Sequence, residues 1–393
     1  MNTASQQKAD IVIIGGGVAG CTAAIALSGH YTVLLIDKLA APVGRIGECL
    51  PPATRRIFKR LGLPEDWAQD GAGEVKALKS MGIQSYWGSD RVQIADHLRN
   101  PDGFGWHLDR QSFEVYLRKT ALERGVQACW PAKLHSAVYE QQRWHITAVD
   151  DMAVNGRKEQ PIEAKLVIDA SGRAAHFARK AGVARHTQDK LISCWAVLPD
   201  AVANKLSTIS AAANGWWYTS ALPGNKRVLA FQTDADLVDR AALKTSAGFA
   251  ALAQDNAQIS TLLDRTAGDI DYRGTVAANT SCLEQFAGTQ WVALGDAAMS
   301  FDPLSSQGMY NAMAGAMQLT ELILQTQLLA DDNFKNLEAF NTTYSNQMNS
   351  IWQQYLRHKD LFYRQERRWV GEAFWRRRGG SNSSELNIKK KLG

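Results

Sequence analysis

A glycine-rich turn between two short apolar runs constrains this chain more than any other feature. Residues 10–14 read DIVII, residues 15–20 read GGGVAG, and residues 21–27 are small and apolar. A second apolar run, residues 32–36, ends on Asp37. Short continuous apolar runs favour buried parallel strands, and the small residues between them favour a closely packed helix. The segment therefore predicts one strand–helix–strand unit of a parallel sheet.

The spacing of the glycines in this turn indicates a dinucleotide site. Gly15 permits the tight turn, Gly17 lets the backbone approach a pyrophosphate, and Gly20 lets the helix pack on the strand. The start of the helix would present N–H groups to the phosphates, and Asp37 would accept a hydrogen bond from a ribose hydroxyl. The pattern by itself does not distinguish NAD from FAD.

A second motif near residue 300 favours FAD. Residues 291–294 form another apolar run that enters Gly295-Asp296, and residues 302–308, DPLSSQG, lead into a long predicted helix. An aspartate at the end of a strand can bind a ribityl hydroxyl. A helix that begins near Gly308 can direct N–H groups at the pyrimidine edge of a flavin and stabilise negative charge there.

Further runs extend this pattern over most of the chain, to about residue 330. They are GECLPP at 47–52, WHLDR at 106–110 and DASGR at 169–173. With the two motifs above, they resemble the superfamily of FAD-dependent monooxygenases and tryptophan halogenases. The resemblance implies an α/β fold, with a doubly wound, glutathione-reductase-like FAD-binding domain, an inserted antiparallel β-sheet substrate domain and a helical C-terminal segment. The expected boundaries are 1–75, 100–185 and 285–330 for the first, 76–99 and 186–284 for the second, and 331–393 for the third.

The resemblance also assigns cofactor-binding roles to individual residues. Arg110 would contact the FAD pyrophosphate, and Asp169 and Gly172 would lie near the cofactor. Arg45 and Glu48 would lie along the isoalloxazine or ribityl edge. The full set of expected cofactor-binding residues is Gly15, Gly17, Gly20, Asp37, Arg45, Glu48, Arg110, Asp169, Gly172, Asp296, Pro303, Gly308 and Met309.

Two features distinguish this chain from the halogenase pattern. Halogenases need a lysine that handles hypohalous acid, and Lys76 matches its place, with Lys79 as a nearby competitor. Halogenases also carry a WxWxIP motif. When the chain is aligned on Pro223, Tyr218 stands at the first tryptophan of that motif and Ser220 at the second. The sequence therefore predicts that Lys76 lies in a solvated strand and that halide is not incorporated.

The aromatic stretch around residue 217 is more similar to the LodB, GoxB and QhpG group of flavoproteins. That likeness implies modification of a tryptophan side chain in a partner protein during the biogenesis of a quinone cofactor. The expected substrate contacts are Trp216, Trp217 and Tyr218. The reaction would proceed through a flavin C4a-hydroperoxide, with dioxygen as co-substrate and with NAD(P)H or a separate reductase supplying electrons.

The sequence leaves the catalytic group and two other activities open. No catalytic base is identified, and Lys76, Glu48 and Cys49 are the only candidates. The alternatives are a halogenase or hydroxylase of a small free aromatic, and an FAD-dependent reductase of a polyprenyl type. Five cysteines without CxxC spacing, and histidines without ligand spacing, predict neither a disulfide framework nor a metal site.

Charge is unevenly distributed along the chain. Residues 351–393 hold eleven Lys or Arg and four Asp or Glu, a balance of +7, whereas the rest carries −2. This concentration argues against a basic coat that binds nucleic acid. Arginines interleaved with aromatic residues in this segment suggest docking of an acidic protein partner, and the tail from Arg376 onward is expected to fray. The sequence shows no apolar leader and no transmembrane run, so a cytoplasmic protein is expected.

Overall fold

A computed structural model describes residues 6–67, 74–151, 153, 156–200, 204–239, 242–266, 269–331 and 334–379. The chain divides into two compact units, each assembled from segments that are distant in the sequence. The first comprises Met1–Lys79, Arg99–Gln188 and Asn279–Trp352. The second comprises Ser80–Leu98, Asp189–Ala278 and Gln353–Gly393.

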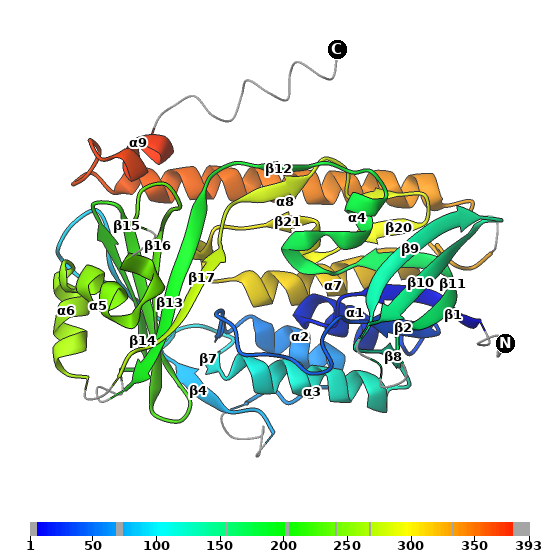
Figure 1. Cartoon of the computed structure of the whole chain (residues 1–393), viewed down its shortest axis with the longest axis horizontal. Coiled ribbons are helices and arrows are strands. Elements are labelled where there is room, and N and C mark those ends of the chain that lie inside the picture. The colour runs from blue at the N-terminus through cyan, green and yellow to red at the C-terminus, as the bar shows by residue number, and fades with distance from the viewer. Residues whose placement is uncertain are drawn as a thin grey trace, which may run out of the picture. The chain divides into compact units, whose positions relative to one another are not determined.

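The first unit is built on an eight-stranded sheet (Figure 1). Strand β1 lies between β2 and β11 and runs parallel to both. Its apolar residues 11–14 are buried, which explains the uninterrupted apolar run in the sequence. The strands, in spatial order with the β10 and β9 extension last, are β19 (Ala287–Gly288), β20 (Trp291–Ala293), β11 (Lys158–Asp169), β1 (Gln7–Ile14), β2 (Val33–Ile36), β8 (Gln127–Cys129), β10 (Arg143–Asp150) and β9 (Lys133–Glu140).

The runs 10–14, 32–36 and 291–294 were each predicted as a strand, and all three predictions are confirmed within this one sheet. The helix between the first two is α1 (Val18–Leu27), which packs against α3 (Arg110–Glu123) and α7 (Gly308–Gln325). Helix α1 is buried almost all round, because its glycine and alanine residues allow close approach by its neighbours.

Short elements complete the first unit. Two three-stranded sheets and several short helices connect the main strands and carry many of the predicted site residues. They are β3 (Cys49–Leu50), β7 (Gly105–Leu108) and β4 (Ala77–Ser80); β12 (Arg185–Thr187), β18 (Ser281–Leu283) and β21 (Met299–Ser300); α2 (Thr54–Leu61), α4 (His176–Lys180), η1 (Gly172–Ala174), η3 (Gly295–Ala297) and η4 (Pro303–Ser305).

The second unit is built on a seven-stranded sheet. Its neighbouring strands are antiparallel, except that β14 and β5 run parallel. The strands, in spatial order and followed by the helices, are β17 (Asp271–Ala277), β13 (Leu191–Pro199), β16 (Lys226–Asp234), β15 (Gly215–Leu222), β14 (Leu206–Ala212), β5 (Gly82–Tyr86) and β6 (Gln93–Asp96), with η2 (Ala242–Lys244), α5 (Ser246–Gln254) and α6 (Ala257–Asp264).

The two faces of this sheet are covered by different elements. Trp217 of β15 packs with Phe231 and with Phe249 of α5, at ring-centroid distances of 4.6 and 5.5 Å. Its neighbour Trp216 contacts Trp87 instead, because successive side chains of a strand point to opposite faces. Trp87 in turn contacts Trp375 near the C-terminus, at 5.3 Å. The second unit therefore has an aromatic core on each face of its sheet.

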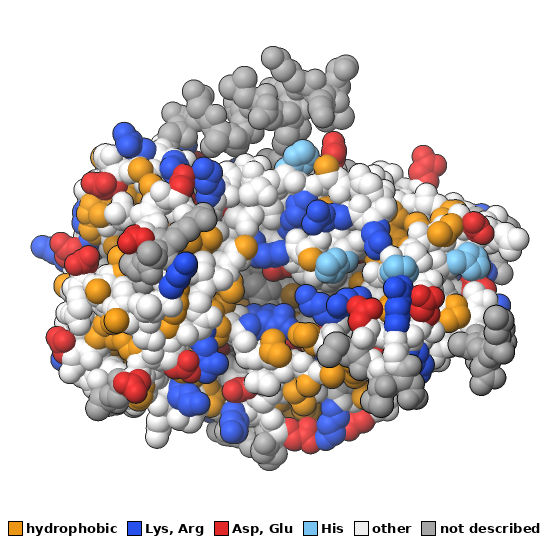
Figure 2. Space-filling model, in the orientation of Figure 1, with side chains coloured by type: hydrophobic (Ala, Val, Ile, Leu, Met, Phe, Trp, Pro, Cys, Tyr) orange, Lys and Arg blue, Asp and Glu red, His pale blue; other side chains and the backbone are white. Residues whose placement is uncertain are grey.

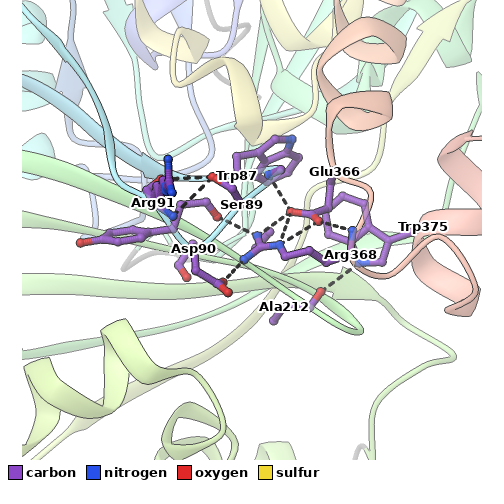
Figure 3. Close-up of polar contacts among 12 residues, drawn as sticks. Trp87, Ser89, Asp90, Arg91, Ala212, Glu366, Arg368 and Trp375 are labelled. Carbon is purple, nitrogen blue, oxygen red and sulfur yellow. Dashed lines mark hydrogen bonds and ion pairs between the residues drawn. The ribbon is translucent and has the colours of Figure 1, made fainter.

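The C-terminal helices are α8 (Leu337–Gln365), which begins in the first unit and ends in the second, and α9 (Ala373–Gly379). The tail was expected to fray from Arg376, and for residues 376–379 this prediction is wrong, because they form part of α9. Trp375 of this helix is buried and its indole N–H donates to the carbonyl of Ala212 at 2.9 Å (Figure 3). Residues 380–393 lie outside the described part of the chain. No helix among the described residues is long and apolar enough to cross a membrane.

Candidate cofactor site

The glycine-rich turn has the geometry that a phosphate cradle requires. Gly15 has φ +113°, and a Cβ on it would lie 2.3 Å from the carbonyl oxygen of Ala170. A Cβ on Gly20 would lie 1.8 Å from the carbonyl oxygen of Gly15. Gly17 differs, because no described atom comes within 4 Å of a Cβ placed there. Gly17 also begins α1 without a side-chain cap, so the first N–H groups of the helix have an open approach for an anion.

Asp37, at the end of β2, is held in place by three donors. Its carboxylate accepts from the N–H groups of Gly16 and Leu39 at 2.6 and 2.7 Å. The guanidinium of Arg118 lies 2.9 Å from it. A carboxylate has about four acceptor positions, so one remains for a ribose hydroxyl. The side chain is 13% exposed, which leaves it accessible to a ligand.

Arg118 was not predicted from the sequence. Its buried guanidinium donates to the carbonyls of Gly16 and Leu39, at 3.0 and 2.8 Å, and lies 4.9 Å from the ring centroid of Trp130. It thereby ties the glycine-rich turn to the loop after β2. Arg110, Glu114 and Arg118 are spaced four residues apart on α3 and share one stripe, a signal that could have revealed the residue.

Two predicted residues, Arg45 and Arg110, meet on the buried carboxylate of Glu114. The Nε of Arg110 donates to Glu114 at 2.9 Å, and Nη2 of Arg45 lies 3.3 Å from it. Arg110 also donates to the carbonyl of Ile46 at 2.6 Å. Gly47 has φ +105°, a conformation that residues other than glycine rarely adopt, and Arg110 Nη1 lies 2.6 Å from the position of a Cβ there. Sequence reasoning missed Glu114, whose carboxylate holds both arginines.

Glu48 and Cys49 follow directly and are poorly suited to act as free catalytic groups. Glu48 is buried and accepts from the N–H of Gly47 at 3.1 Å. Burial, and to a lesser extent the charge of Glu48, raises the pKa of the Cys49 thiol to about 12. The thiol therefore stays protonated at neutral pH, which favours packing over nucleophilic chemistry.

Asp169 has a structural role in the loop after β11. Its fully buried carboxylate accepts from the hydroxyl and N–H of Ser171, at 2.6 and 3.0 Å, and from the N–H groups of Phe177 and Ala178, each at 2.9 Å. The side chain thus holds the start of α4 against the sheet, and its four protein donors satisfy it. Gly172, with φ +70°, begins η1 in the same loop.

The second predicted motif also has features that suit a ligand. Asp296 lies in η3 with half of its side chain exposed, and Arg173 Nε is 3.8 Å from its carboxylate. Gly295 has φ +61°, and a Cβ on it would lie 3.0 Å from the Cβ of Ala19, so glycine lets η3 lie close to α1. Both Asp296 and the α1 turn therefore belong to one packed region of the first unit.

Helix α7 begins beside η4, where Pro303 occupies the first position. No side chain caps the start of α7, and no described atom lies within 4 Å of a Cβ placed on Gly308. The side chain of the next residue, Met309, is buried. The first unit thus contains two open helix N-termini in contacting helices, α1 and α7. Together with the exposed carboxylate of Asp296, this arrangement fits FAD, whose pyrophosphate and reduced ring are both anionic.

The predicted substrate residues of β15 are part of the core of the second unit. Trp216 and Trp217 are each 1% exposed and Tyr218 is 8% exposed. The indole N–H of Trp216 donates to the hydroxyl of Tyr363 at 3.1 Å. Contact of these three side chains with a substrate stays a prediction, and Trp216 and Trp217 contact other aromatic side chains of the same unit.

The two lysines compared with the halogenase residue differ in their surroundings. Lys76 is exposed and lies immediately before β4, where its backbone carbonyl accepts from the N–H of Asp109 at 2.9 Å. The ammonium of Lys79 lies 3.3 Å from the carboxylate of Asp66. One amine is therefore solvated and the other is neutralised by an ion pair.

Arg368, Arg377 and Arg378 hold the C-terminal segment to other parts of its own unit. Arg368 binds the buried carboxylate of Glu366 and also Asp90, as Figure 3 shows. Arg377 and Arg378 bind Asp234, and Arg377 also binds Asp236. Part of the positive charge counted in this segment is therefore engaged within the unit, whereas Arg357, Arg364, Arg367 and Arg376 are exposed among its described residues.

Comparison with known proteins identifies the family. The sequence profile of tryptophan halogenases matches residues 10–95 and 89–392. The chain belongs to the tryptophan halogenase family. The FAD-dependent oxidoreductase LodB of Marinomonas mediterranea is 28% identical over 377 residues, which cover 94% of this chain and 96% of LodB. The chain is accordingly a flavin-dependent, halogenase-like oxidoreductase with FAD as its cofactor.

Solved structures share the fold. The myxobacterial chondrochloren halogenase CndH superposes with a TM-score of 0.81 at 20% identity, covering 96% of this chain and 87% of that one. QhpG, a peptidyl tryptophan dihydroxylase essential for tryptophylquinone cofactor biogenesis, superposes with a TM-score of 0.73 at 22% identity, covering 96% and 80%. The α/β class predicted from the glycine-rich turn is confirmed.

Proposed function

We propose that this protein is an FAD-dependent monooxygenase that hydroxylates an electron-rich aromatic ring. The proposed substrate is a tryptophan side chain of a partner protein, modified during the biogenesis of a quinone cofactor. Dioxygen would be the co-substrate, and NAD(P)H or a separate reductase would supply the electrons. The first unit would bind FAD and the second would form the substrate domain.

The observation that carries the choice of hydroxylation over halogenation is the environment of Lys76 and Lys79. Halogenation needs an amine that is held at the site of reaction and can handle hypohalous acid. Lys76 is exposed and the ammonium of Lys79 is paired with Asp66. The tryptophan of the halogenase motif is also replaced by Ser220, which is fully buried in β15.

A protein substrate is supported by one structural relative, QhpG, and the match with LodB supports an FAD-dependent oxidoreductase of the same length. LodB matches this chain over nearly the whole length of both proteins. QhpG, which acts on a peptidyl tryptophan, has the same fold over 96% of this chain. A ring within a polypeptide would need an exposed surface for docking, and Arg367 and Arg376 would supply positive charge there.

The residues of the first unit would act mainly by binding and orienting the cofactor. The open N-terminus of α1 would bind the pyrophosphate, Asp37 the adenosine ribose and Asp296 the ribityl chain. Arg110, fixed by Glu114, would lie beside the pyrophosphate. When bound, reduced FAD supplies the activation of dioxygen, and the protein excludes water and holds the aromatic ring in position.

A second candidate is halogenation of a free or carrier-bound aromatic compound. It is favoured by the family itself, whose profile covers the chain from residue 10 to residue 392. Under this alternative, one of the two lysines would be essential, and Lys79 would have to leave Asp66 to react.

The deciding experiment uses FAD-loaded protein, a reductase and dioxygen in the presence of bromide. The probes are free tryptophan and purified quinoprotein precursors encoded beside the gene. We expect a gain of oxygen on a protein-borne tryptophan, without bromine, and largely unchanged turnover in Lys76→Ala and Lys79→Ala. A brominated product that disappears in either lysine variant would establish the halogenase instead.

A further inference from the structure

An open groove on the first unit is lined by three arginines. Its volume is about 460 Å³, and it is lined by Arg173, Arg179, Arg185 and Thr187 together with residues 182–184. None of these lining residues is Asp or Glu. Figure 2 shows Lys and Arg side chains gathered over α4, the helix that carries Arg179. The groove is therefore electropositive.

Arg185 is held mainly by neutral oxygens. It donates to the hydroxyls of Ser281 and Ser300, at 3.0 and 2.6 Å, and to the carbonyls of Asp296 and Ala297, at 2.9 and 2.8 Å. These partners fix the guanidinium without neutralising its charge. Burial lowers the pKa of Arg185, and the neighbouring charge of Arg173 lowers it further, although Asp296 acts in the opposite direction.

Arg173 is fixed in the same way. It donates to the carbonyls of Asn279 and of Phe301, the latter at 3.2 Å. The carboxylate of Asp296 is 3.8 Å away and half exposed to water. The charges of the two guanidiniums, of Arg173 and Arg185, are thus opposed by only the carboxylate of Asp296, which is half exposed to water. The groove therefore keeps a net positive charge.

Arg179 and Thr187 complete the groove with exposed donors. Arg179 lies in the last turn of α4, and Thr187 ends β12. Neither residue belongs to the set assigned to FAD. The groove therefore offers two positioned cations, one exposed guanidinium and a hydroxyl to a single ligand.

We propose that this arginine groove binds the phosphate groups of a soluble ligand. The planar guanidinium matches a phosphate through paired N–H donors, and fixed arginines lose little entropy when they bind one. The volume lies within the range of roughly 300–1,000 Å³ that is usual for small-molecule sites. A nucleotide such as a reduced nicotinamide dinucleotide and a free inorganic phosphate share this chemistry. The proposal does not depend on whether the enzyme hydroxylates or halogenates.

The test measures binding to the FAD-loaded protein by titration calorimetry, so that the probes cannot occupy an empty FAD site. The probes are NADPH, ADP and inorganic pyrophosphate at fixed ionic strength. The variants are Arg179→Gln and Arg179→Glu. Lys59→Gln, which removes an exposed charge from α2 outside the groove, is the matched control.

We expect pyrophosphate to bind wild type and Lys59→Gln equally. The dissociation constant should rise about tenfold in Arg179→Gln, as for loss of one charge-assisted hydrogen bond, and binding should be lost in Arg179→Glu. NADPH binding tighter than pyrophosphate, with the same dependence on Arg179, identifies a nucleotide ligand. Equal affinities identify a phosphate-ion site. Absence of binding at millimolar concentration, or equal affinity in wild type and Arg179→Glu, would overturn the proposal.

Discussion

The pair formed by Asp37 and Arg118 allows the account of the cofactor site to be tested in detail. Asp37→Asn keeps the size and one acceptor oxygen but removes the charge that neutralises the buried guanidinium of Arg118. Breaking a buried pair from one side costs about 3–5 kcal/mol. Since Asp37 remains 13% exposed and asparagine keeps an acceptor, we expect a loss of about 2 kcal/mol in the unfolding free energy of the first unit.

The same substitution should weaken FAD binding, because one acceptor of Asp37 is assigned to the ribose. A loss of about 1–3 kcal/mol corresponds to a rise of roughly fivefold to 150-fold in the dissociation constant. Urea unfolding of the cofactor-free protein, followed by circular dichroism, gives the stability. FAD titration gives the affinity.

Arg118→Met and the double variant separate the two effects. In the double variant no buried charge is left unpaired, so the loss of stability should be smaller than the sum of the two single losses by about 1–2 kcal/mol. Additive losses would show that the ion pair does not stabilise the turn. An unchanged FAD affinity in Asp37→Asn would refute the assigned contact with the ribose.

Three other predictions concern separate parts of the chain. Trp375→Ala should lower the unfolding free energy of the second unit by about 3–5 kcal/mol, because it removes a buried ring and leaves the Ala212 carbonyl without its indole donor. Urea unfolding should show a lower midpoint, and an unchanged midpoint would contradict the contribution of Trp375 to the aromatic core. Cys49 should resist iodoacetamide at pH 8 in the native protein, since its pKa of about 12 leaves almost no thiolate. Rapid alkylation seen by mass spectrometry would contradict this raised pKa. Burial alone would raise the pKa of Glu366, but hydrogen bonds from Arg368 and from the Gly88 N–H outweigh burial and lower the pKa below its ordinary value of 4.5. The contribution of Glu366 to stability is therefore present above pH 4.5 and is lost as the pH falls through the folded-state pKa. A pH series of urea midpoints in wild type and Glu366→Gln would measure this loss, and identical profiles in acid would contradict it.

The parts of the fold that local sequence determines were predicted correctly. The run DIVII became β1, and the small residues after Gly20 became α1, because apolar continuity and glycine spacing act within thirty residues. Lys76 was expected in a solvated strand; its exposure was predicted correctly, but it precedes β4 and is not part of a strand.

Residues whose partners lie far away in the sequence were missed or read differently. Glu114 became visible only when the fold brought Arg45 to it, and Arg118 only when Gly16 lay beside α3. For Asp169, the sequence did not reveal that its carboxylate accepts from the N–H groups of Phe177 and Ala178 at the start of α4, and its proximity to the cofactor stays a prediction.

The C-terminal segment shows the same limitation. Its charge balance suggested an open docking surface, but the count could not show that Asp234 lies where Arg377 and Arg378 reach it. Nor could composition show that Trp375 is buried. Composition therefore showed where the charged and aromatic residues gather. It could not show which of them pair with residues more than a hundred positions away in the same chain.

The most direct test of the central claim follows the origin of the new atom in the product. The FAD-loaded protein, supplied with electrons, ¹⁸O₂ and bromide, is incubated with a candidate precursor protein, and its tryptophan-containing peptides are examined by mass spectrometry. The account predicts incorporation of ¹⁸O into one tryptophan side chain and no bromine. A brominated ring, or an oxidised tryptophan that carries only oxygen from water, would contradict it.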